Sequence, residues 1–224
     1  MRGKPGASRR DFLGLAGALL LGKASKGHPW LWPTTPGVEK KSKVVISRDP
    51  QLRKPGPRMD SDRLLKMLDR AMQSLYGGDS AVEAWKRVVR PGEVVGLKVN
   101  CLAGRGISTN VQLVEAVCER LQQAGIKAKE IVIWDRLNWD LESAGFRIAE
   151  RGEGIRCFGN DTLGYEQELA TYGSVGSLLA RTLTQVCDAV ISLSVLKDHG
   201  ITGVTMALKN LFGAIHNPNK YHVD

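Results

Sequence analysis

Chargeable side chains stand between two apolar runs in the stretch VISLSVLKDHGITGVTMALKNLFGAI, which extends from Val190 to Ile215. An ammonium group binds phosphate or carboxylate, and an imidazole changes its charge near neutral pH. Lys197, His199 and Lys209 are therefore the candidate catalytic residues, with the lysines holding an anion and the histidine moving protons. His199 can also serve as a metal ligand or a positioning donor, and the sequence leaves these roles open.

Lys209 interrupts the segment 204–215, in which apolar or small residues occupy nearly every side of a predicted helix. Such a helix is expected to be buried. A buried lysine is costly unless it is paired, which indicates a partner or a task for Lys209. The alternative is that its amine reaches the edge of the sheet along its apolar stem. Thr205 precedes Lys209 by one turn, so we expect both on one helix face.

Gly200 and Gly203 come just before this predicted helix. Free N–H groups at a helix amino terminus form an anion site, to which Lys197 and Lys209 would add charge. Gly200, Gly203 and Thr205 are therefore candidate ligand-binding residues.

A metal site is a weaker hypothesis for the same region. His216 and His222 follow the predicted helix, but their spacing matches no compact metal-binding motif. The candidate metal ligands are Asp135, His216 and His222, and His199 could join the two histidines.

The middle of the chain predicts a βαβ unit. Residues 93–100 and 130–135 have the pattern of buried strands, and residues 110–125 have that of a helix ending in glycine. A weaker strand pattern follows near 155–158, and a strong one covers 188–196. We therefore expect an α/β fold with a mainly parallel sheet flanked by helices, joined by right-handed crossovers.

Polar residues follow the predicted strands, and parallel sheets bind ligands at the carboxyl ends of their strands. The first strand ends in Lys98 and Asn100, the second in Asp135, and the last is followed by Lys197 and His199. These ends predict one shared crevice. The alternative is that strands simply end at a charged surface.

Three regions are predicted along the 224 residues. Residues 1–27 resemble an export signal. Residues 28–58 are a linker rich in Pro and Lys, with a first strand predicted at 43–47. The α/β domain covers 59–224 and begins with a helix in the segment 60–78.

The formal net charge of +9 belongs mainly to the leader and the linker. Residues 59–224 contain nineteen Lys and Arg against twenty Asp and Glu, so the predicted domain is close to neutral. A nucleic-acid-binding domain clusters its basic residues on the fold itself, among stacking aromatic residues. The sequence therefore argues against a nucleic-acid partner.

The leader has a basic start followed by a short apolar run over 12–22, which is the layout of a secretory signal and too short for a membrane span. Arg9 and Arg10, within SRRDFLG, resemble the twin-arginine export signal, although Gly14 stands where that pattern has a polar residue. The alternative is a basic amphipathic start. The resemblance implies a partner in the twin-arginine export machinery and a periplasmic location, or a membrane-associated one if the leader is kept.

The four cysteines form no iron–sulfur or zinc spacing. Buried thiols are the favoured interpretation, and a disulfide between two of them is the alternative in an oxidising compartment.

Two stretches, VVGLKVNCLAGRGISTNVQLVEAVCERLQQAGIKAKEIVIWD and LKDHGITGVTMALKNLFGAI, resemble the domain-of-unknown-function family 362. The second carries its Lys-x-His, Gly-x-Thr and Leu-Lys-Asn-x-x-Gly patterns. Some relatives carry ferredoxin-like cysteine motifs, which this chain lacks. Relatives run well past this length, so the resemblance implies a domain truncated at its carboxyl end. Matched by position, the residues of interest are Lys98, Asn100, Thr109, Asp135, Lys197, His199, Thr205, Lys209 and Asn210.

Two functions compete on this evidence. One is an exported protein with an anion- or cofactor-binding site at the strand ends, acting as an enzyme through Lys and His chemistry. The alternative is a non-catalytic envelope protein that binds a cofactor or metal and serves a redox partner protein. A metal or an anionic cofactor fits either function, and the sequence identifies neither substrate nor reaction.

Overall fold

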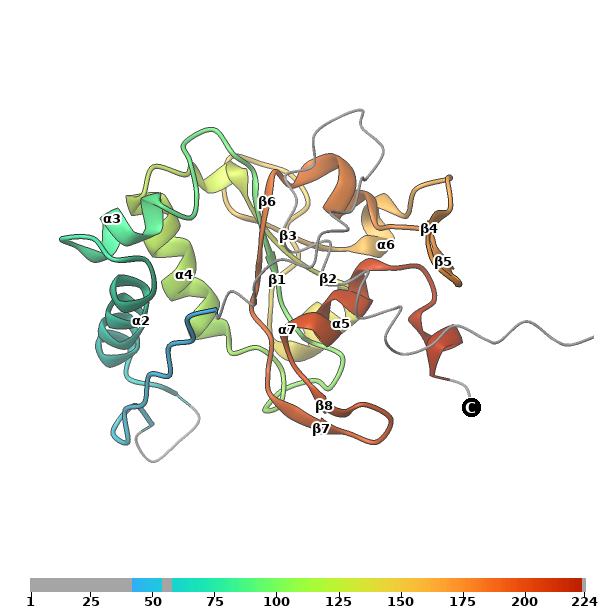
Figure 1. Cartoon of the computed structure of the whole chain (residues 1–224). Coiled ribbons are helices and arrows are strands. Elements are labelled where there is room, and N and C mark those ends of the chain that lie inside the picture. Colours follow the sequence, from blue (N-terminus) through green and yellow to red (C-terminus); the bar gives the residue numbers. More distant parts are fainter. Residues whose placement is uncertain (1–41, 54–57, 223–224) are drawn as a thin grey trace, which may run out of the picture.

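A four-stranded parallel sheet forms the centre of the molecule, as predicted, in a computed structural model that describes residues 42–53 and 58–222. Its spatial order is β3-β2-β1-β6 (Figure 1). The strands are β1 (Val95–Lys98), β2 (Ile131–Asp135), β3 (Arg156–Gly159) and β6 (Ala189–Ser192). The predicted βαβ unit is confirmed, because β1 and β2 pair in parallel on either end of a helix.

The order of the strands reverses beside β1. The chain runs from β1 to β2 and β3 on one side, then returns to place β6 on the other side of β1. Lys98 stands opposite Trp134 of β2 and Ser192 of β6, so the carboxyl ends of these three strands are level. Open α/β sheets bind ligands outside such a reversal point.

Helices cover the first face of the sheet. The helix α4 (Val111–Gln123) begins at Asn110, whose side chain accepts hydrogen bonds from two backbone N–H groups of the first turn. Its buried face and that of α5 (Asn138–Ala144) share one apolar core with β1. This packing uses the helical spacing of Val114, Val117 and Leu121.

Two further helices lie outside α4. The predicted amino-terminal helix is confirmed as α2 (Ser61–Tyr76), capped by Asp60, and the short α3 (Ala81–Lys86) follows it. Arg120 of α4 and Asp69 of α2 form an ion pair of 2.7 Å that ties the two helices together. Figure 1 shows α2, α3 and α4 grouped on one side of the sheet.

The second face of the sheet is covered by irregular elements. A smaller core joins Val132, Trp134 and Phe158 of the sheet to Ala214. The elements on the way to and from β6 are α6 (Asn160–Leu163), the hairpin of β4 (Ala170–Tyr172) and β5 (Val175–Ser177), the π-helical turn η2 (Thr182–Val186) and the 3-10 turn η3 (Leu211–Ala214).

The helix predicted over 204–215 is wrong for its first half. The chain instead forms a hairpin of β7 (Lys197–His199) and β8 (Gly203–Thr205), which extends beyond the end of the sheet in Figure 1. Only α7 (Ala207–Asn210) and η3 are helical, and η4 (Pro218–Tyr221) follows. Val204 in β8, Met206 before α7 and Leu208 in α7 are 38–52% exposed, so the expectation that nearly every side of this segment is buried is wrong.

The strand predicted at 43–47 is also wrong. These residues have no regular secondary structure and pair with no strand among those described, and Val44 and Ile46 are 78% and 74% exposed. The alternation in this segment lacks a sheet neighbour to fix it. The predicted leader and most of the linker lie outside the described residues.

All four cysteines are free and buried, which confirms the favoured interpretation. Burial raises the pKa of the Cys118, Cys157 and Cys187 thiols to about 12. None of the described helices has both the length and the apolar character that crossing a bilayer requires.

Candidate functional site

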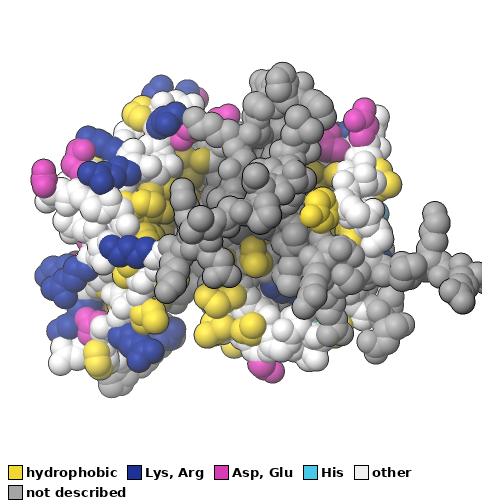
Figure 2. All heavy atoms as spheres, viewed as in Figure 1, with side chains coloured by type: hydrophobic (Ala, Val, Ile, Leu, Met, Phe, Trp, Pro, Cys, Tyr) yellow, Lys and Arg dark blue, Asp and Glu magenta, His cyan; other side chains and the backbone are white. Residues whose placement is uncertain are grey.

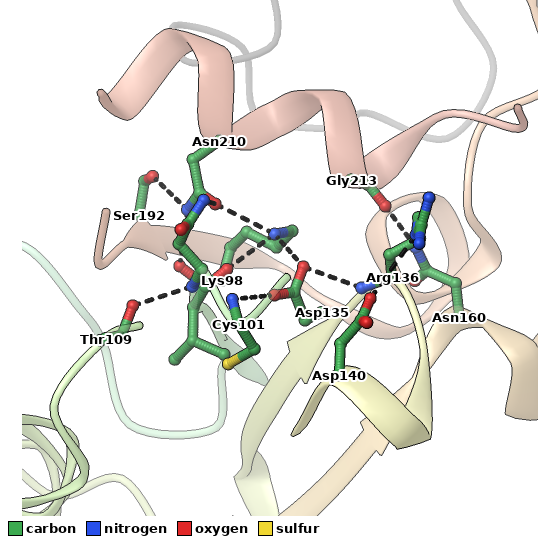
Figure 3. Close-up of polar contacts among 12 residues, drawn as sticks. Lys98, Cys101, Thr109, Asp135, Arg136, Asp140, Asn160, Ser192, Asn210 and Gly213 are labelled. Atoms are coloured by element: carbon green, nitrogen blue, oxygen red, sulfur yellow. Dashed lines mark hydrogen bonds and ion pairs between the residues drawn. The ribbon is translucent and has the colours of Figure 1, made fainter. Parts of the chain in front are cut away.

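Lys98 is a cation held under the carboxyl edge of the sheet, with 1% of its surface exposed. Its amine lies 2.6 Å from Oδ1 of Asp135 and also donates to Val99 O at 2.7 Å and to Asn210 Oδ1 at 3.2 Å (Figure 3). An ammonium group has three N–H donors, and these contacts use all of them. Lys98 therefore has no donor left for a ligand.

Besides pairing with Lys98, Asp135 binds the backbone at the start of two loops. Its Oδ1 accepts from the Arg136 N–H at 2.8 Å, and its Oδ2 accepts from the Cys101 N–H at 2.6 Å. The carboxylate therefore fixes the chain where it leaves both β1 and β2.

Asn210 connects α7 to two strands. Its Nδ2 donates to Lys98 O at 3.0 Å and to Ser192 Oγ at 3.1 Å, while its Oδ1 accepts from Lys98 and from Asn100 Nδ2. Both amide hydrogens are used, so Asn210 positions α7 across the ends of β1 and β6 (Figure 3).

Thr109 closes the loop that follows β1. Its hydroxyl donates to Leu193 O at 2.6 Å and accepts from the Asn100 N–H at 2.8 Å. The side chain is 3% exposed and has no hydrogen left to donate. We call Lys98, Asn100, Thr109, Asp135, Ser192 and Asn210 the buried network.

Gly213 explains how η3 comes so close to this network. A Cβ atom at this position would lie 2.9 Å from both Cε and Nζ of Lys98 and 3.1 Å from Asp135 Oδ1. Asn160 holds the same turn by donating to Gly213 O at 2.6 Å. The glycine of the Leu-Lys-Asn-x-x-Gly pattern is therefore required by the ion pair beneath it.

Lys197 lies where the buried network meets the hairpin. Its amine donates to Asn100 Oδ1 and to Ile107 O, the latter at 3.2 Å, which leaves one N–H free. Burial lowers the pKa of Lys197, and the nearby Asp135 opposes that shift.

The hairpin presents Lys197 and His199 on one face, because side chains two positions apart in a strand point the same way. Thr205 is opposite Lys197 and is buried, whereas Gly203 is opposite His199 and places no side chain beside it. Gly203 has a φ of 74°, which favours glycine. The prediction that Gly200 and Gly203 lie at a helix amino terminus is wrong, because Gly200 lies in the turn of this hairpin and Gly203 begins β8.

His199 has its ring fixed by the same turn. Its Nδ1 accepts from the backbone N–H groups of Thr202 at 3.2 Å and Ile201 at 3.3 Å. A neutral imidazole that accepts at Nδ1 carries its hydrogen on Nε2. Burial lowers the pKa of His199, and the neighbouring Lys209 and His222 lower it further. The resting ring therefore presents a neutral Nε2–H donor.

Lys209 faces a second histidine. Its amine lies 2.8 Å from Nε2 of His222 and 4.1 Å from the centre of the Phe212 ring. The Nδ1 of His222 is 3.0 Å from Pro218 O, and a carbonyl only accepts, so Nδ1 carries the hydrogen and Nε2 accepts from Lys209. Burial lowers the pKa of Lys209. The rings of His199 and His222 are 5.6 Å apart, and we call Lys197, His199, Lys209 and His222 the open cluster.

A comparison with known protein families shows to which family the chain belongs. The sequence profile named Domain of unknown function (DUF362) matches residues 95–224, which is more than half of the sequence. The chain belongs to this family. No curated protein and no solved structure matches it.

The metal candidates of this DUF362 chain lie apart. Asp135 is engaged in the buried network, His222 contacts Lys209, and His216 packs edge-on against Tyr165 with ring centres 5.1 Å apart. In the part of the chain that the structure describes, no group of three His, Cys, Asp or Glu side chains could hold a metal ion.

Sequence reasoning missed two features of the DUF362 site. Ser192, at the end of β6, is an acceptor for Asn210, and no pattern in the sequence marked it. His222 pairs with Lys209 rather than with another ligand-type residue. Lys209 and His222 are thirteen residues apart, a separation that matches no helix or strand period and therefore gave no sequence signal.

A groove of about 610 Å³ lies elsewhere, between residues 47–50 and α2. Figure 2 shows Lys and Arg side chains gathered over this side of the DUF362 chain. Acidic residues are interleaved with them, and Arg63 is paired with Asp49 at 3.1 Å. Lys66 and Arg70 line the same groove without an ion pair to any described residue, but the groove contains no histidine and lies away from the strand ends.

Proposed function

We propose that the open cluster binds a small anion, a carboxylate or phosphate, at the carboxyl ends of β1 and β6. The observation that carries the proposal is the difference in free hydrogen-bond donors. The buried network uses its donors internally, whereas Lys197, His199 and Lys209 keep unused N–H groups. Lys197 precedes His199 by two positions on one strand face, and the His199 ring lies 5.6 Å from the ring of His222, which contacts Lys209.

The charge of the open cluster favours an anion over a cation. Neither Lys197 nor Lys209 has a carboxylate within ion-pair distance among the described residues. Both amines are partly withdrawn from water, which lowers the pKa of each. A bound anion would supply the missing negative charge, and charge-assisted hydrogen bonds are the strong ones.

Each member has a separate part in this proposal. Lys197 and Lys209 hold the negative charge, and the Nε2–H of His199 donates to an oxygen of the ligand. His222 accepts from Lys209 and can take its proton, which gives the site a base next to an amine. Proton transfer at the ligand is therefore the chemistry that the site would supply as an enzyme.

Calorimetry with inorganic phosphate and with acetate tests anion binding on the full chain. We expect Lys197→Gln and Lys209→Met each to weaken binding by about tenfold or more, because each removes a hydrogen bond to a charged group. Lys86→Gln is the matched control, since Lys86 lies on α3 and pairs with Glu83 at 2.9 Å. Equal weakening by Lys86→Gln, or no binding to the wild-type chain, would contradict the proposal.

We also propose that the protein is exported by the twin-arginine route, on the strength of the Arg9-Arg10 pair and the apolar run after it. A reporter that is active only after export, fused behind residues 1–58, tests this. Export should stop with Arg9→Lys combined with Arg10→Lys. Export that persists in this double variant would contradict the route.

A further inference from the structure

We propose that Lys209 condenses with the carbonyl group of a small 2-oxo acid to form an imine, with Lys197 binding the carboxylate of the same molecule. This inference rests on the proposed anion site and names the class of its ligand. Nothing in the buried network takes part, because Lys98 has no free donor and no exposed amine.

The surroundings of Lys209 are those of a nucleophilic amine. Its single polar contact among the described residues is a neutral ring nitrogen of His222, which is a base rather than a carboxylate. The Phe212 ring covers another side of the amine. Removal of water and of fixed negative charge favours the uncharged amine, and burial lowers the pKa of Lys209 accordingly.

The hairpin of β7 and β8 supplies a hydrogen-bond donor for the carbonyl oxygen of a 2-oxo acid and a cation for its carboxylate. The Nδ1 of His199 is occupied by two backbone N–H groups, and its ring lies 5.6 Å from that of His222, so the free Nε2–H is the group that can donate to the carbonyl oxygen. Lys197 lies two positions earlier on the same strand face, with one N–H free for the carboxylate. Residues two positions apart on a strand are roughly 7 Å apart, so the long Lys197 stem has to span most of the distance between the carboxylate and a carbonyl held by His199.

The reaction balances without any further reactant. His222 takes a proton from the Lys209 ammonium, and the freed lone pair forms a bond to the carbonyl carbon. The carbonyl π electrons move to the oxygen, which takes that proton. The nitrogen then releases its second hydrogen, the C–O bond breaks, and the oxygen leaves as water with both protons. The product is the protonated imine of Lys209, which keeps the third hydrogen on its nitrogen, with the carboxylate still held by Lys197.

Trapping with pyruvate and cyanoborohydride at neutral pH tests the imine on the full chain. Reduction would leave one 1-carboxyethyl group, located by peptide mass spectrometry. We expect Lys209 to be labelled about tenfold or more faster than Lys220, an exposed lysine that donates to Gly176 O at 3.0 Å. Lys209→Arg should abolish the fast label, whereas Lys220→Arg should leave it unchanged.

Acetaldehyde separates carboxylate recognition from amine reactivity. Lys197→Gln should slow labelling by pyruvate about tenfold while leaving labelling by acetaldehyde unchanged. His222→Asn should slow both, because it removes the base beside the amine. Labelling of Lys209 no faster than that of Lys220, or equal effects of Lys197→Gln on both reagents, would overturn the inference.

The outcome also distinguishes this inference from the proposed function. Binding of phosphate and acetate without any fast label on Lys209 would overturn the imine alone. A fast acetaldehyde label on a chain that binds no anion would contradict the anion site and, with it, the 2-oxo acid.

Discussion

Two groups of polar side chains share the carboxyl ends of the strands, and they differ in how their hydrogen-bonding groups are used. Lys98 in the buried network directs all three of its N–H groups to protein acceptors. Lys209 in the open cluster contacts one neutral nitrogen and an aromatic ring. Both lysines belong to patterns of the family, yet Lys98 has no N–H left for a ligand, whereas Lys209 has only one polar contact among the described residues.

The difference shows that a conspicuous charged residue need not meet a ligand. A buried ion pair contributes little net stability compared with an apolar pair, but removing one partner leaves an uncompensated charge. The buried network therefore fixes the strand ends and α7, and the open cluster is positioned by it through Asn100 and Lys197. Substitutions should separate these two roles.

The largest effect on stability is expected for Lys98→Met. The change leaves the Asp135 carboxylate buried without its cation, which costs about 3–5 kcal/mol. Urea unfolding followed by circular dichroism measures the loss. Lys86→Met, at the surface pair with Glu83, is the matched control and should leave the urea midpoint in place. Similar midpoints for the two variants would contradict the structural role of Lys98.

Gly213→Ala should destabilise the protein by about 1–3 kcal/mol, because the added methyl group overpacks the Lys98 amine 2.9 Å away. Gly154→Ala is the control, since a Cβ there meets no atom within 4 Å. Thermal unfolding compares the two. An unchanged melting temperature for Gly213→Ala would show that η3 does not press on the ion pair.

Thr109→Val should cost about 1–3 kcal/mol, because it leaves the buried Asn100 N–H and Leu193 O without their partner. Thr109→Ser keeps the hydroxyl and should recover most of the loss. Equal urea midpoints for the Val and Ser variants would remove Thr109 from the network.

In the open cluster, by contrast, a substitution should reduce ligand binding and leave the stability of the fold nearly unchanged. Lys209→Met should change the stability by less than about 1 kcal/mol, since no partner loses a charge, while anion binding falls as described above. Urea unfolding provides the first readout and calorimetry the second. A large loss of stability would place Lys209 among the structural residues.

The smallest effect concerns pH and His199. Its pKa is lower in the folded protein than in the unfolded chain, so the unfolded chain binds more protons as the pH falls below the usual histidine range. This contribution to stability is therefore present at neutral pH and is lost on acidification. In His199→Gln the free energy of unfolding should fall less steeply between pH 7 and pH 5 than in the wild-type protein, and urea unfolding curves at a series of pH values measure this slope. The same slope in both proteins would contradict the neutral ring.

The sequence predicted the sheet and its layers well, because the buried strands and α4 have strong local patterns. The capping residue Asn110 and the spacing of Val114, Val117 and Leu121 are examples. It also named most of the residues that make up the buried network and the open cluster. It did not predict which lysine is fully hydrogen-bonded, because the partners of Lys98 include Asp135 and Asn210, the latter 112 residues away.

The hairpin and the strand at 43–47 were mispredicted for related physical reasons. The segment 197–205 contains two short strands around a glycine turn, and its apolar residues also fit a helix. Tertiary contacts of Lys197 and Thr205 decide between the two. At 43–47 the alternation is real, but no neighbouring strand is available in the described part of the chain to pair with it.

The bond between Lys98 and Asn210 joins positions 112 residues apart. On a ribosome that adds roughly 5–20 residues per second, the amide that completes this contact is made roughly 6–22 s after the lysine. Until then the nascent chain has β1 and β2 but lacks the acceptor and the turn that cover them. A ligand can therefore bind at the strand ends only after Gly213 has been synthesised. A chain whose translation stops earlier would leave the carboxyl ends of β1 and β2 uncovered and accessible to chaperones.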